Sequence, residues 1–78
     1  MNDKLTFDIK TKIGVLSTNP KTGWSKEINI VSWNDRPYKY EIRDWDPEHE
    51  KMSKGISLTE TEVRELARIL NNFFGGQK

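Results

Sequence analysis

The chain has 78 residues with 13 Lys or Arg and 12 Asp or Glu, and its net charge of +1 gives little support by itself for a nucleic-acid partner. It has no cysteine and one histidine, which excludes disulfides and the common zinc patterns. With 33% hydrophobic residues the core must be thin, so oligomerisation is the expected aid to stability. We expect one domain over residues 1–78, in the cytoplasm, because no segment is apolar enough to span a membrane.

The first predicted element is a strand over residues 5–15. Its apolar residues stand at odd positions, the period of two that indicates a strand with one buried face: Leu5, Phe7, Ile9, Ile13 and Val15. Two alternatives to one continuous strand are that it starts only near Phe7, or that it is broken near Thr11. A turn is predicted from Asn19 to Gly23, because Asn-Pro initiates turns and Gly accepts a positive φ.

A second strand is predicted over residues 24–33. Ile28 and Ile30 share one face of it, whereas Val31 and Trp33 share the other. Either both faces are partly buried, or a bulge near Ile30–Val31 shifts the phase. The cluster 34–37 then predicts a second turn, in which a proline ends the pairing.

A third strand is predicted over residues 38–45. Tyr38, Tyr40 and Ile42 alternate with Arg43 and Trp45, which occupy the other face. If Ile42 points to the core, Arg43 and Trp45 point away from it, so that an indole and a guanidinium share an outward face.

A polar loop over residues 46–55, a short strand from Ile56 to Leu58 and one helix complete the predicted α+β order, β-β-β-β-α. Thr59 at the N-cap and Glu62 at N3 form a capping box. Gly75-Gly76 is expected to end the helix. Apolar residues follow the i, i+3, i+4 rule along one side of it: Val63, Leu66, Ala67, Ile69, Leu70, Phe73 and Phe74.

Enzymatic chemistry finds little support in the sequence. His49, the only histidine, lies among carboxylates in the predicted loop, where we expect it to be solvated. No serine lies in a nucleophile-elbow pattern, and the glycines are too scattered for a phosphate-cradling loop. We expect no catalytic residue, no metal ligand and no cofactor.

Aromatic and basic residues interleave between positions 21 and 54, a pattern typical of single-stranded nucleic-acid binders. Flat rings stack on exposed bases, and Lys or Arg beside them neutralises phosphates. The candidate rings are Trp33 and Trp45, with Trp24, Tyr38 and Tyr40 less securely placed; the candidate cations are Lys21, Lys26, Arg36, Lys39, Arg43 and Lys54.

Two alternatives stay open for the apolar groups. Trp24, Tyr38 and Tyr40 are equally well explained as packing residues of a small core. The end of the helix stripe exceeds what one sheet face needs, which favours a dimer interface at Ile69, Phe73 and Phe74, with ordinary core burial as a close competitor.

Two segments resemble the transcriptional positive cofactor four family, a group of single-stranded DNA-binding coactivators. They are Tyr40-Glu41-Ile42-Arg43-Asp44-Trp45-Asp46-Pro47-Glu48 and Lys54-Gly55-Ile56-Ser57-Leu58-Thr59, and the chain as a whole is most similar to the small bacterial YdbC-type branch. The resemblance implies a curved four-stranded antiparallel sheet with one helix, paired into a homodimer whose strands form a groove for single-stranded DNA. It places the binding residues at Trp33, Arg43, Trp45 and Lys54, with Lys26 and Lys39 less securely matched.

The sequence therefore predicts a homodimeric, largely sequence-independent single-stranded DNA binder that acts in transcription, replication or repair, with a nucleoid-associated location and contact with transcription or replication machinery. A protein-interaction module that uses the apolar helix surface is the alternative from another class, and RNA is the alternative ligand.

Overall fold

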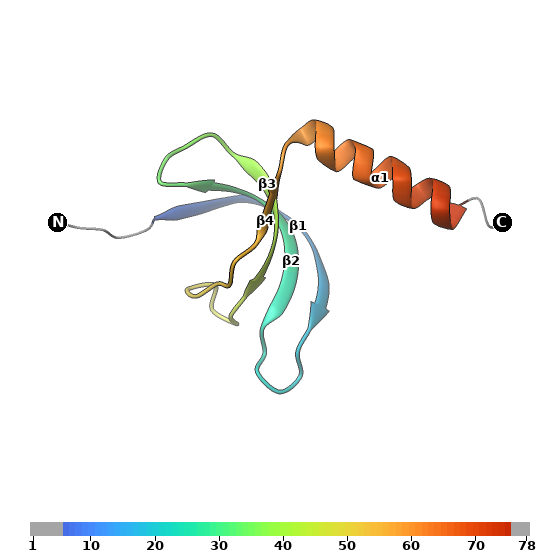
Figure 1. The fold of residues 1–78 in the computed structure, drawn as a ribbon. Helices are drawn as coiled ribbons and strands as arrows, with labels where there is room; N and C mark the ends of the chain where they lie inside the picture. Colours follow the sequence, from blue (N-terminus) through green and yellow to red (C-terminus); the bar gives the residue numbers. More distant parts are fainter. Residues whose placement is uncertain (1–5, 76–78) are drawn as a thin grey trace.

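The computed structural model describes residues 6–75 and contains one antiparallel sheet followed by a helix (Figure 1). The strands are β1 (Phe7–Thr18), β2 (Ser25–Trp33), β3 (Lys39–Trp45) and β4 (Ile56–Leu58), and they lie in the order β1-β2-β3-β4. The helix α1 (Glu60–Gly75) follows β4. The predicted β-β-β-β-α order is confirmed. The predictions for Leu5 and Gly76 concern residues outside the described part of the chain.

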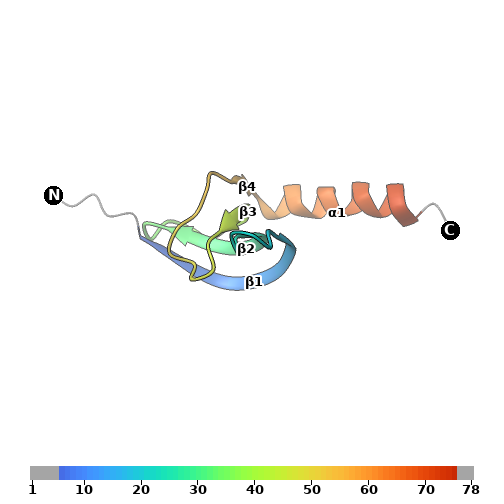
Figure 2. The same cartoon turned by 90° about the horizontal axis from the view of Figure 1, so that it is seen from below.

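Irregular pairing bends β1 over the rest of the sheet. Its pairing with β2 shifts between Ile9 and Thr11, between Lys12 and Gly14, and again further along, so that β1 carries extra residues against β2. Each extra residue adds a local bend and twist to its strand, and Figure 2 shows the resulting curve of β1. β1 therefore begins at Phe7 and is irregular near Thr11, and both alternatives given for this strand are confirmed.

The bulge predicted in the second strand near Ile30–Val31 is wrong in its location. The β2–β3 register runs without a shift from Ser25↔Trp45 to Val31↔Lys39. The irregularity opposite Ile30 and Val31 lies on β1 instead. Both faces of β2 are partly covered, which is the other interpretation of its pattern.

The sheet has two faces of different chemistry. We name one the Trp33 face; its residues on β2 and β3 are Glu27, Asn29, Val31, Trp33, Glu41, Arg43 and Trp45, which alternate along the strands and pair across them. We name the other the isoleucine face; it presents Ile28, Ile30, Tyr40 and Ile42, with Ile56 and Leu58 of β4 beside them.

The expectation that Trp45 points away from the core is wrong. Trp45 does share a face with Arg43, but it is only 1% exposed. The segment after β3 folds back over this face, with Met52 bridged to Trp45, and the rings of Phe7 and His49 lie 5.1 and 5.5 Å from its indole. The strand phase was correct, but the loop buries the part of this face around Trp45, which was expected to be exposed.

The helix begins as predicted and lies almost entirely outside the sheet. The Thr59 hydroxyl accepts the Glu62 N–H at 3.1 Å, and the Glu62 carboxylate accepts the Thr59 N–H at 2.9 Å, which confirms the capping box. The helix meets the sheet only at β3 and β4 and then extends away from it (Figures 1 and 2). None of its described residues is buried.

No helix in the described part of the chain is long and apolar enough to cross a membrane.

Candidate nucleic-acid interface

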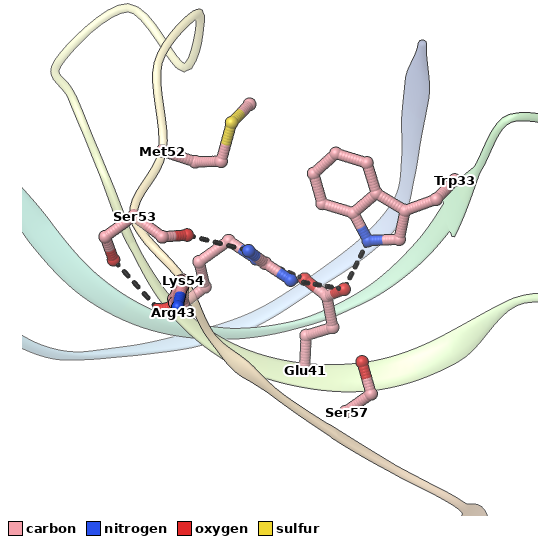
Figure 3. Close-up of a pocket in the computed structure, with 7 residues that line it drawn as sticks. All are labelled: Trp33, Glu41, Arg43, Met52, Ser53, Lys54 and Ser57. Atoms are coloured by element: carbon pink, nitrogen blue, oxygen red, sulfur yellow. Dashed lines mark hydrogen bonds and ion pairs between the residues drawn. The ribbon is translucent and has the colours of Figure 1, made fainter. Parts of the chain in front are cut away.

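A hollow of about 430 Å³ opens on the Trp33 face, and we name it the Trp33 hollow (Figure 3). Strands β2, β3 and β4 and the loop before β4 all contribute to its walls. Its lining residues are Trp33, Glu41, Arg43, Met52, Ser53, Lys54 and Ser57.

A hydrogen-bond network organises the wall of this hollow. Arg43 donates to both oxygens of Glu41, from Nε to Oε1 at 2.8 Å and from Nη2 to Oε2 at 3.0 Å, and its Nη1 donates to the Ser53 carbonyl at 2.7 Å. The Trp33 indole N–H also donates to Oε2 of Glu41. Two-residue spacing on a strand places Glu41 and Arg43 on one face, where they meet.

Aromatic rings support Trp33 from below the surface. The Arg43 guanidinium carbon lies 4.8 Å from the centroid of the Trp33 ring, within the range of a cation–π contact. The Trp45 ring is nearly parallel to it, at 7° and 6.3 Å, and Phe7 packs against both indoles. Trp33 itself is partly buried and lines the hollow, so part of its side chain stays accessible beside these contacts.

Gly55 allows the chain to pass close over Arg43 before it enters β4. A Cβ atom at this position would lie 2.7 Å from the Ile42 carbonyl oxygen and 2.9 Å from the Arg43 Cβ. Only a residue without a side chain fits so near a backbone oxygen. This passage places Lys54 at the wall of the hollow.

Two further predicted cations reach the same face. Arg36 and Lys39 line a second hollow of about 150 Å³, together with Trp33 and Ser57, which also line the first. Among the described residues, the side chains of Arg36, Lys39 and Lys54 form no ion pair. The structure thus brings together Trp33, Arg43 and three exposed cations.

The other predicted site residues lie elsewhere. Lys21, Trp24 and Lys26 line a hollow of about 560 Å³ at the tip of the β1–β2 hairpin, which we name the hairpin hollow. Lys26 is on the isoleucine side of β2 and pairs with Asp44 at 3.1 Å. The predicted binding set is therefore divided between two surfaces.

The prediction that His49 is solvated is wrong. Its Nε2 lies 3.0 Å from each carboxylate oxygen of Glu27, and its ring stacks on Trp45. It helps to close the loop over the buried indole. Among the described residues, no group of three or more His, Cys, Asp or Glu side chains is placed to hold a metal ion.

Sequence reasoning missed four residues of the Trp33 hollow, namely Glu41, Met52, Ser53 and Ser57. The spacing of Glu41 and Arg43 carried a usable signal, because a carboxylate and a guanidinium two positions apart on a strand are neighbours on one face. Met52 and Ser53 carried none, since the path of the 46–55 loop depends on tertiary contacts.

Comparison with known proteins shows the family of this chain. The sequence is 43% identical over 72 residues to an uncharacterized protein of Treponema pallidum (strain Nichols), an alignment that covers 92% of this chain and 84% of the relative. The sequence model of the family described as transcriptional coactivator p15 (PC4) matches residues 21–69, which include β2, β3, β4 and most of α1. The chain therefore belongs to the transcriptional coactivator p15 (PC4) family.

Proposed function

We propose that this protein binds single-stranded DNA, largely without regard to sequence, on its Trp33 face. The observation that carries the proposal is the partly exposed ring of Trp33, packed against other aromatic rings and bordered by Arg36, Lys39 and Lys54, which form no ion pair among the described residues. Rings of this kind stack on bases and contribute about 1–3 kcal/mol per base, with little dependence on sequence.

The residues of this face take different parts in the proposal. Arg36, Lys39 and Lys54 contact phosphates, while Trp33 and the plane of Arg43 meet a base in the hollow. Trp45 is a support for Trp33 rather than a stacking ring, because its own ring is buried. Lys21, Trp24 and Lys26 form a separate contact at the hairpin hollow, reached by a longer strand.

A homodimer is part of the proposal, because the apolar stripe of α1 is largely exposed in the described part of the chain. Ile69 is 49% exposed, Phe73 63% and Phe74 66%, and the neighbouring Leu70 is exposed as well. Ordinary core burial, the competing interpretation of these residues, does not describe this structure. A contiguous apolar surface of this kind marks an interaction site, and a second copy would cover it.

The test is a titration of the protein with oligo-dT across a salt series, followed by tryptophan fluorescence. We expect quenching and a salt-dependent affinity, and Lys39→Ala is expected to reduce the slope of log K against log salt by about 0.7. Arg64→Ala removes the same charge from the exposed helix and should leave the slope unchanged. Absence of both quenching and salt dependence at micromolar protein would rule the proposal out.

Two measurements separate the alternatives. Competition between matched DNA and RNA oligonucleotides decides the ligand, since the 2′-hydroxyl is the group that distinguishes them. Light scattering decides the second candidate function, a protein-interaction module on the exposed helix stripe: a stable monomer favours a foreign partner, and a dimer favours self-association. A role in transcription, replication or repair, at the nucleoid and beside its machinery, follows only if DNA is the ligand.

A further inference from the structure

Glu41 is a buried acid at the centre of a face that we propose to bind a polyanion. Its side chain is only 1% exposed and lines the Trp33 hollow. A carboxylate in such a place repels phosphate, so it needs a compensating role.

The contacts of Glu41 indicate that role. One oxygen accepts the Trp33 indole N–H, and both oxygens accept the fork of donors from Arg43 (Figure 3). Planar, two-point pairing of this kind fixes the orientation of a guanidinium as well as its position. One buried side chain thus holds the two groups that form the wall of the hollow.

The same contacts neutralise the positive charge of Arg43. Its side chain is 15% exposed, and its Nη1 donates to the Ser53 carbonyl at 2.7 Å. By contrast, Arg36, Lys39 and Lys54 on the same face are exposed and have no acidic partner among the described residues. On this face Arg43 is therefore neutralised by an acid, whereas the other three cations can each meet a phosphate.

We infer that Glu41 is a positioning residue for DNA binding: it holds Trp33 and Arg43 as a preformed stacking wall and keeps Arg43 from acting as a phosphate ligand. The inference rests on the proposed function and deepens it, because it separates base contact from phosphate contact. Preforming the wall also spares the ordering cost of two large side chains on binding.

Glu41→Gln tests the inference, since it keeps the size of the side chain and removes its charge. Arg43 then becomes an available cation, and the slope of log K against log salt for oligo-dT should steepen by about 0.7, one phosphate. At high salt, where phosphate contacts weaken, the variant should bind about five-fold more weakly, near the lower end of what one stacked base contributes. The plots of log K against log salt for the variant and for the unaltered protein should therefore cross.

Glu27→Gln is the matched control. Glu27 is another buried carboxylate of the Trp33 face, but it does not line the Trp33 hollow, and its carboxylate hydrogen-bonds to Asn29 and His49 rather than to Trp33 and Arg43. Its salt plot should run parallel to that of the unaltered protein. If both variants steepen the slope equally, loss of negative charge alone explains the effect and the inference is overturned.

A measurement on the unaltered protein decides the question even if Glu41→Gln does not fold. Hydrogen exchange at the Trp33 indole N–H and the Arg43 Nε–H is followed by NMR with and without saturating oligo-dT. Retained protection of both supports the inference, whereas loss of protection at Arg43 shows that it leaves Glu41 on binding and overturns it. Failure of the unaltered protein to bind oligo-dT contradicts the proposed function, while binding with parallel salt plots for Glu41→Gln contradicts only the inference.

Discussion

Replacing Gly55 with alanine should destabilise the protein through a single steric contact. The added Cβ would lie 2.7 Å from the Ile42 carbonyl oxygen, 2.9 Å from the Arg43 Cβ and 3.0 Å from the Arg43 Nε. The first of these is backbone in a strand that pairs on both sides, so it cannot move without disturbing the sheet. The segment before β4 must shift instead.

The size of the effect follows from two opposing contributions. Overpacking of this kind costs about 1–3 kcal/mol. Alanine also restricts the unfolded chain, which offsets about 0.4–1 kcal/mol of that loss. A net loss of about 1.5 kcal/mol lowers the melting temperature of a chain this size by roughly 6–12 °C.

Thermal unfolding followed by circular dichroism at one fixed protein concentration measures this change, because the midpoint of an oligomer depends on concentration. Gly14→Ala is the control: a Cβ there meets nothing within 4 Å, and its melting temperature should stay close to that of the unaltered protein. Equal midpoints for the two variants would show that the close passage over Arg43 does not constrain Gly55.

Three further predictions concern the helix cap, the loop after β3 and the hairpin. Thr59→Ala removes the capping hydroxyl and should cost about 1 kcal/mol, whereas Thr61→Ala should change the melting temperature much less. The backbone N–H of Lys51 is the main group that lowers the pKa of Asp46 below its ordinary value of 3.8. The ionised Asp46 therefore stabilises the folded protein above that value, and this stabilisation is lost as pH falls through the lowered pKa. Asp46→Asn should remove part of the fall in melting temperature toward about pH 3. Trp24→Ala should weaken binding of long dT oligomers and leave that of short ones unchanged in the same titration; equal losses at all lengths would place Trp24 in the main site.

Local patterns predicted the elements well because they depend on neighbours in the chain. The Thr59–Glu62 capping box and the turn at Asn19 are set by hydrogen bonds across two to five residues. The period of two along β3 placed Glu41, Arg43 and Trp45 on one face correctly. Predictions that needed the distant partner of a strand, such as the position of the bulge, were less successful.

The sequence by itself determined the order of the elements, the helix start and the family, since each depends on local chemistry or on motifs such as Lys54 to Leu58. Only the tertiary structure decided which face is open, because the fold of the 46–55 loop onto Trp45 involves contacts with Phe7 and Glu27 from distant strands. It also decided that Arg43 pairs with Glu41, whereas Arg36, Lys39 and Lys54 form no ion pair among the described residues. Burial and pairing depend on where the chain returns, and a linear pattern of residues does not carry that information.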